Sequence, residues 1–108
     1  MKKISNKIVF FGSGPVAAES LRLLQKHTEV EAVITKSSTR HEMQSVAQTA
    51  PILTANSKAE LDALITEQSF KSRLGVLIDF GIIVSQDAID SFELGIINSH
   101  FSILPEWR

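Results

Sequence analysis

The residues of this chain best suited to chemistry are Asn98 and His100, which follow the apolar, β-branched pair Ile96-Ile97. Successive side chains of an extended strand point to opposite faces, so Asn98 and His100 are expected on the same face, two residues apart. A carboxamide can hydrogen-bond to a developing oxyanion, and an imidazole can also move a proton near neutral pH. An isolated Asn-x-His pair more often caps the end of a strand, so the neighbouring residues decide between the two interpretations.

The residues around this pair extend it into a longer pattern, N-S-H-F-S-I-L-P, followed by Trp107-Arg108. The pattern resembles the signature of the folate-dependent formyltransferases. Position by position, Asn98 and His100 match the family's catalytic asparagine and histidine. The segment that helps to bind the folate donor is matched by Ser102, Ile103, Leu104 and Pro105, with Ile103 in place of the usual leucine. A match of this length is more specific than a glycine pattern alone.

The resemblance implies that a formyl group passes from 10-formyltetrahydrofolate to an amine, without a metal. It is closest to the members whose acceptor is the amino group of methionyl initiator tRNA, which would be a partner of the full-length enzyme. The Trp107-Arg108 pair favours this acceptor over a purine precursor, and a nucleotide sugar stays an alternative. Asn98 would hydrogen-bond to the oxyanion of the tetrahedral intermediate, and His100 would stabilise it and move a proton.

The resemblance also bears on domain organisation. In this family the catalytic domain continues beyond the position of Arg108, supplies an aspartate that completes the catalytic pair, and is followed by a domain that holds the tRNA. Residues 1–108 are therefore expected to be the N-terminal part of a formyltransferase catalytic domain, with the remainder absent and the isolated chain inactive. An alternative is a non-catalytic truncated product that pairs with another chain through an open sheet edge.

Apolar runs alternate with helical patterns along the chain, which predicts one α/β domain with a Rossmann-like fold. We expect an open, mostly parallel, twisted sheet with helices on both faces. The expected strands are residues 7–11, 30–35, 51–53, 74–78 and 96–100. The expected helices are residues 15–26, 57–70 and 86–92, with a short helical piece near 42–48 inside a mildly basic surface loop, 36–49. Ser57 and Glu60 form a capping-box pattern, in which each side chain bonds a backbone N–H at the helix start.

The turn at residues 12–15 offers a second interpretation. Gly12, Gly14 and Ala17 satisfy the loose G-x-G-x-x-G/A pattern of dinucleotide-binding proteins, and they stand between a strand and a helix. That pattern also expects an acidic residue at the end of the second strand, whereas Glu31 lies at its other end. A tight turn with close helix packing explains the glycines equally well. A dinucleotide-binding module without transfer chemistry therefore stays open.

Residues 79–84, D-F-G-I-I-V, follow the fourth expected strand. They resemble the family's apolar segment whose backbone surrounds the pterin ring, which assigns Phe80, Gly81 and Ile82 to the folate site. Apolar residues in such a position are also commonly core residues. Because the carboxyl ends of parallel strands meet at one edge, we expect the glycine turn, residues 79–83 and residues 98–105 to lie together there.

Composition narrows the class of protein. The 108 residues are 44% apolar and 21% charged, as in an ordinary globular domain, and the net charge of −1 does not indicate broad electrostatic binding to nucleic acid. The absence of cysteine excludes disulfides and thiolate metal sites and fits a cytoplasmic protein. No apolar run approaches the ~18 residues of a membrane helix. We therefore predict no membrane association. The histidines lack the spacing of metal ligands, so we also predict no metal.

Overall fold

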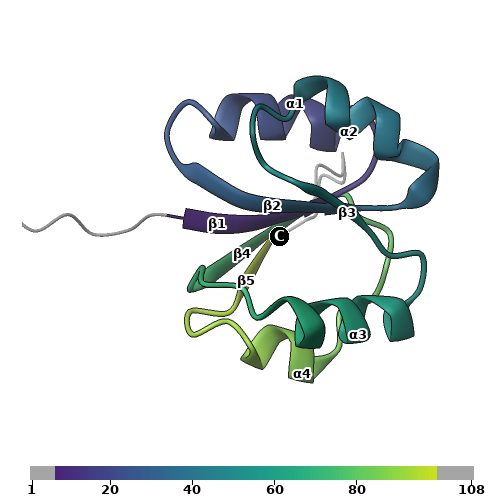
Figure 1. The fold of residues 1–108 in the computed structure, drawn as a ribbon, viewed down its shortest axis with the longest axis vertical. Helices are drawn as coiled ribbons and strands as arrows, with labels where there is room; N and C mark the ends of the chain where they lie inside the picture. Colours follow the sequence, from purple (N-terminus) through teal and green to yellow (C-terminus); the bar gives the residue numbers. More distant parts are fainter. Residues whose placement is uncertain (1–6, 100–108) are drawn as a thin grey trace, which may run out of the picture.

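The computed structural model describes residues 7–99, which form an open α/β sheet (Figure 1). Within these residues, five strands pair in parallel in the order β3-β2-β1-β4-β5. The strands are β1 (Lys7–Gly12), β2 (Glu29–Thr35), β3 (Ile52–Thr54), β4 (Leu74–Ile78) and β5 (Ile96–Ser99). The helices are α1 (Pro15–Leu24), α2 (Arg40–Val46), α3 (Lys58–Gln68) and α4 (Gln86–Asp90), with a 3-10 turn, η1 (Ser37–Thr39), before α2. The predicted parallel α/β architecture is confirmed.

Helices cover both faces of the sheet, with α1 and α2 on one face and α3 and α4 on the other (Figure 1). Side chains that alternate along the central strands supply both layers, so Phe10 packs beneath α1 and α2 while Phe11 packs toward α3 and α4. The first layer also contains Ala17, Leu21, Val33, Met43 and Ile78. The second contains Ile34, Leu61, Ile65, Leu77, Phe80 and Phe92. Burial on both faces explains why the central strands are apolar without alternation.

Several boundaries differ from those predicted. Helix α1 ends at Leu24 rather than residue 26, and α3 ends at Gln68 because Ser69 takes a left-handed conformation with φ of 50°. Helix α4 ends at Asp90, and β3 is shifted by one residue. The segment predicted as a surface loop begins its helix at Arg40, and its Met43 is fully buried. Tertiary packing of Met43, together with the partly buried Val46 and Ala47, therefore stabilises a segment whose sequence is mostly polar.

The start of α3 matches the capping-box prediction in one half. The Ser57 hydroxyl accepts a hydrogen bond from the backbone N–H of Glu60 at 3.1 Å, as expected. The Glu60 carboxylate accepts from the backbone N–H of Asn56 at 2.7 Å, and not from that of Ser57. Both side chains therefore bond backbone N–H groups at the helix start, but the Glu60 carboxylate bonds the residue before the cap instead of the cap itself, as a standard capping box would. None of the helices within residues 7–99 has both the length and the apolar character needed to cross a membrane.

At the end of the sheet where the strands begin, Glu31 of β2 binds the segment that precedes β4. Its carboxylate accepts hydrogen bonds from the backbone N–H of Lys71 at 2.9 Å, the N–H of Ser72 at 2.8 Å and the Ser72 hydroxyl at 2.6 Å. Burial opposes ionisation of this group, but these hydrogen bonds, helped by the charge of Lys7, hold the pKa of Glu31 below its ordinary value. The acid excluded as a ribose ligand therefore has a structural role, since it fixes the chain that leads into β4.

Replacing Glu31 by glutamine is expected to lower the free energy of unfolding at pH 7 by about 1 kcal/mol, because an amide supports fewer of these hydrogen bonds and the site is partly solvated. A depressed folded-state pKa contributes stability that is present above the unfolded pKa and is lost as pH falls through the folded pKa. The difference between parent and variant should therefore shrink in acid. Urea unfolding at pH 7 and below pH 4 measures this difference, with Glu67→Gln, at an exposed position of α3, as the control. A difference independent of pH would contradict the role of the carboxylate charge.

Candidate functional site

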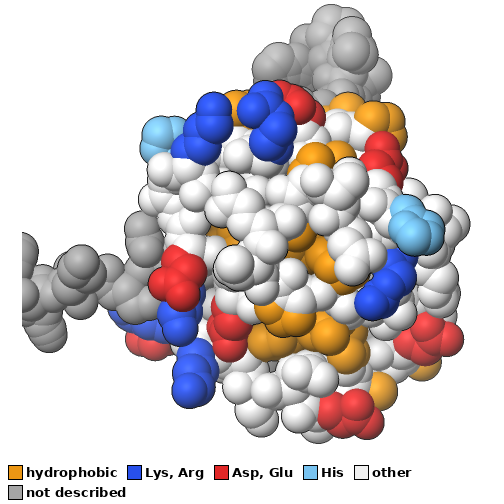
Figure 2. All heavy atoms as spheres, turned by 45° about the horizontal axis from the view of Figure 1, so that its top comes forward, with side chains coloured by type: hydrophobic (Ala, Val, Ile, Leu, Met, Phe, Trp, Pro, Cys, Tyr) orange, Lys and Arg blue, Asp and Glu red, His pale blue; other side chains and the backbone are white. Residues whose placement is uncertain are grey.

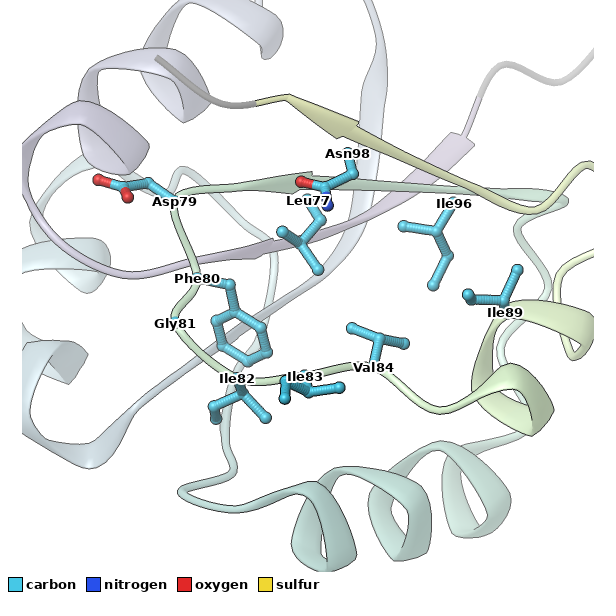
Figure 3. Close-up of a pocket in the computed structure, with 10 residues that line it drawn as sticks. All are labelled: Leu77, Asp79, Phe80, Gly81, Ile82, Ile83, Val84, Ile89, Ile96 and Asn98. Atoms are coloured by element: carbon cyan, nitrogen blue, oxygen red, sulfur yellow. The ribbon is translucent and has the colours of Figure 1, made fainter. Parts of the chain in front are cut away.

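A pocket of about 530 Å³ opens at the carboxyl ends of β4 and β5 (Figure 3). Its walls come from Leu77 on β4, the loop that follows β4, Ile89 on α4, and Ile96 and Asn98 on β5. Three residues assigned to the folate site from the sequence, Phe80, Gly81 and Ile82, all line it. The structure thus brings the end of β5 and the loop after β4 around one apolar space, as the rule for parallel sheets predicts.

The loop after β4 turns sharply at two positions, because Asp79 and Gly81 have φ of 54° and 84°. Between them the Phe80 side chain is only 1% exposed and packs edge-to-face on Phe11, with ring centroids 6.0 Å apart. Phe80 therefore belongs to the hydrophobic core and at the same time forms a wall of the pocket. Farther along the same loop, Ile83 is 77% exposed, so it lines the pocket without contributing to the core.

Asn98 takes its position from the pairing of β5 with β4. Asn98 stands opposite Leu77 in the parallel register, and it shares a face with Ile96, two residues earlier, which packs against the core layer under α3 and α4. In Figure 3 its carboxamide lies beside Leu77 at the upper rim of the pocket. Among residues 7–99, no group forms a hydrogen bond with this carboxamide. The described part of the chain therefore leaves its amide N–H groups unused.

Asp79 lies at the end of the pocket nearest the glycine turn. Its carboxyl group points away from Asn98 and from the apolar walls (Figure 3). The sequence left Asp79 either as a structural acid or as a site residue, and the structure places it at the margin of the site. The Asp79 carboxylate therefore does not lie beside the Asn98 carboxamide (Figure 3).

The remaining predicted site residues fall outside the described part of the chain. They are His100, Ser102, Ile103, Leu104 and Pro105, which follow directly on β5. Their roles stay predictions. Within residues 7–99, no three side chains of histidine, cysteine, aspartate or glutamate gather in an arrangement that could hold a metal ion.

The glycine turn lies at the same edge of the sheet, and packing explains its first glycine. A Cβ atom on Gly12 would lie 2.7 Å from the Ala17 Cβ and 2.9 Å from the Ile78 carbonyl oxygen, so a side chain would push α1 away from the sheet. The turn is also joined to η1, the 3-10 turn that follows β2, because the Ser13 and Thr39 hydroxyls are hydrogen-bonded at 3.0 Å. These contacts support the interpretation that the glycines serve a tight turn and close helix packing.

Some pocket residues were not identified from the sequence. Leu77, Ile89 and Ile96 were taken only as parts of their strands and helix. Alternation offered a signal for Ile96, because it stands two residues before Asn98 in β5 and therefore shares its face. Leu77 could be found only through its pairing with Asn98 in the neighbouring strand. Ile89 could not be found in this way, since its place depends on how α4 packs against the sheet.

The strand order and the position of the pocket define a doubly wound α/β domain with a pocket beyond the carboxyl ends of its strands, where domains of this class usually bind ligands. Residues 5–108 match the formyl transferase family model, and the chain belongs to the formyl transferase family.

Several curated relatives of this chain are methionyl-tRNA formyltransferases. The chain is 32% identical to the methionyl-tRNA formyltransferase of Akkermansia muciniphila, with 94% of this chain and 36% of that protein aligned. It is 32% identical to the enzyme of the same name from Elusimicrobium minutum (94% and 33% aligned) and 33% identical to that from Bifidobacterium adolescentis (94% and 36%). The chain therefore spans about one third of the length of these relatives.

Proposed function

We propose that this chain forms the donor-binding part of an enzyme that transfers a formyl group from 10-formyltetrahydrofolate to the amino group of methionyl initiator tRNA. The observation that carries the proposal is the Asn98 carboxamide, free of hydrogen bonds within residues 7–99, at the rim of an apolar pocket in a member of the formyl transferase family. The names of the relatives support the acceptor.

The pocket suits the pterin ring of the folate donor. Its volume of about 530 Å³ lies within the range of roughly 300–1,000 Å³ usual for small-molecule sites. Phe80, Ile82 and Ile83 provide apolar walls, and the Gly81 turn leaves the backbone of the loop accessible to a heterocycle. Ser102, Ile103, Leu104 and Pro105 are proposed to complete the donor site. The folate is consumed in each turnover and is therefore a substrate.

The proposed chemistry is a nucleophilic acyl transfer. The amino nitrogen of the acceptor attacks the formyl carbon, and the carbonyl oxygen becomes an oxyanion in a tetrahedral intermediate. Asn98 donates a hydrogen bond to that oxygen, and His100 stabilises it and moves the proton lost by the attacking amine. The bond between the formyl carbon and the folate nitrogen then breaks, the folate nitrogen gains a proton, and the oxygen becomes a carbonyl again. The products are the formylated amine and tetrahydrofolate.

A ligand titration tests the donor site directly. A non-hydrolysable 10-formyltetrahydrofolate analogue is titrated into the chain and into an Asn98→Ala/His100→Ala variant, with NAD and NADP as competing ligands. We expect the parent chain to bind the folate analogue, the variant to bind it more weakly, and neither dinucleotide to bind. Binding of a dinucleotide without folate binding would overturn the proposal in favour of a dinucleotide-binding module.

The acceptor needs a separate comparison. The alternatives are an amino group on a purine precursor or on a nucleotide sugar, which share the proposed donor site. A chimera, in which residues 5–108 replace the matching segment of the Akkermansia muciniphila enzyme, is offered each acceptor with the same folate donor. Formylation of methionyl initiator tRNA would show that residues 5–108 sustain formyl transfer, and would support the proposed acceptor. A chimera that formylates none of the acceptors would contradict the proposal.

A further inference from the structure

Lys36 makes an unusual contact with the loop that forms the pocket. Lys36 follows β2 and Gly81 follows β4, and these strands are separated in the sheet by β1. A Cβ atom placed on Gly81 would lie 2.8 Å from the Lys36 Nζ and 3.3 Å from its Cε. The Lys36 side chain therefore reaches past the end of the intervening strand and rests against the backbone of Gly81.

The backbone of Lys36 is fixed by hydrogen bonds. The Lys36 backbone carbonyl oxygen accepts from the backbone N–H of Thr39 at 3.1 Å and from the Thr39 hydroxyl at 3.3 Å. The next residue, Ser37, donates its N–H to the Asn56 carboxamide at 3.0 Å, which ties this segment to the start of α3. The side chain thus extends from a fixed support toward the pocket loop.

The far end of the side chain has a different character. Lys36 is only partly exposed, yet its ammonium group forms no ion pair and no hydrogen bond within residues 7–99. Lys36 does not line the pocket, whereas Gly81, on which it rests, does. The same loop carries the negative charge of Asp79, and opposite charges on the two segments attract even beyond the distance of an ion pair.

Gly81 is the position at which such a contact matters most. Its φ of 84° is a conformation that residues with a side chain rarely adopt, and it sets the direction in which Phe80 and Ile82 leave the turn. A side chain on Gly81 would also displace the Lys36 ammonium. The absence of a Cβ and the presence of Lys36 are therefore two parts of one packing arrangement.

We propose that Lys36 is a positioning residue of the pocket, which holds the loop of residues 79–83 in its ligand-binding conformation without contacting the ligand. As a statement about ligand affinity, the inference rests on the proposed function. As a statement about the loop, it can be tested without any ligand. From the sequence, Lys36 was expected in a mildly basic surface loop, and the contact with Gly81 suggests a specific role for this residue.

The test compares Lys36→Met, which keeps an unbranched side chain but removes the terminal nitrogen and its charge, with Lys36→Arg, which keeps the charge. Lys26→Met, at the other end of α1 from the pocket, is the matched control. NMR spectra of the ligand-free chain report the backbone amides of residues 79–83. Titration with the non-hydrolysable folate analogue reports affinity, and thermal unfolding shows that each variant folds.

We expect Lys36→Met to shift the amides of Gly81 and Ile82 in the absence of ligand and to weaken folate binding about three- to tenfold, the range of moderate coupling between contacting residues. In Lys36→Arg, the loop amides and the folate affinity should stay close to those of the parent. Lys26→Met should change neither the amides nor the affinity. Unchanged loop amides in Lys36→Met would overturn the inference, and weaker binding with unchanged amides would assign Lys36 to direct ligand contact instead. If the parent chain does not bind the folate analogue, the proposed function fails, while the amide shifts still decide the role of Lys36.

Discussion

Replacing Asn98 by alanine is expected to lower kcat for formyl transfer by about 10²–10³-fold, the effect typical of removing one oxyanion donor. The Asn98 carboxamide lies at the pocket rim on the strand face shared with Ile96, and no described group competes for its N–H donors. In the proposed mechanism, the hydrogen bond from Asn98 is strongest when the formyl oxygen carries negative charge, so kcat should fall more than KM rises. Steady-state kinetics of the chimera that contains residues 5–108 measure both constants.

Two further variants make this prediction specific. Asn98→Asp has nearly the same shape but lacks the N–H donor and carries a negative charge, so it should be at least as impaired as Asn98→Ala. Ile97→Ala changes the neighbouring side chain, which is 54% exposed on the opposite face of β5, and should leave kcat within about twofold of the parent. An Asn98→Ala enzyme that keeps a third or more of the parent's kcat would show that the carboxamide does not stabilise the transition state.

Replacing Phe80 by alanine is expected to lower the free energy of unfolding by about 3–5 kcal/mol, because a fully buried aromatic side chain is removed and a cavity remains. Phe80 is 1% exposed and packs on Phe11, which in turn packs edge-to-face on Phe92 at 6.0 Å. Domains of this kind are stable by only about 5–15 kcal/mol, so the loss is a large part of the total. Urea unfolding followed by circular dichroism measures it.

Ile83→Ala is the matched comparison for Phe80, since both residues line the pocket and lie in the same loop. Ile83 is 77% exposed, so its truncation should change the free energy of unfolding by about 0.5 kcal/mol or less. Folate affinity should fall in both variants, because both lose apolar contact with the ligand. Equal effects of the two substitutions on stability would contradict the assignment of Phe80 to the core.

The sequence predicted Phe80 as a binding residue and also admitted that it could be a core residue. The structure shows that these interpretations are compatible, because the pocket is a gap at the edge of the hydrophobic layer under α3 and α4. The one-dimensional pattern could not show this, since it contains no information on which core side chains border empty space. The sequence also could not show where the Asp79 side chain points. Asp79 has a positive φ, and its carboxyl group points away from Asn98.

Local patterns were reliable where one strong signal acts within a few residues. The bounds of β4 follow from a continuous apolar run, and the Ser57 cap of α3 follows from the spacing of Ser57 and Glu60. The start of α2 was missed because its stability comes from Met43, which is buried among residues of α1 and the sheet that are distant in sequence. Packing between distant segments outweighs local propensity in such places.

By itself, the sequence determined the parallel α/β architecture and the gathering of the residue 79–83 loop and Asn98 at one edge of the sheet. Both follow from strand and helix periodicity together with the fixed direction of parallel strands. Only the tertiary structure decided that Phe80 belongs to the core and the pocket at once, that Glu31 anchors the chain before β4, and that Lys36 rests on Gly81. Each of these contacts joins residues at least 40 positions apart or depends on the cavity between elements, and such distances are set by packing rather than by any local pattern.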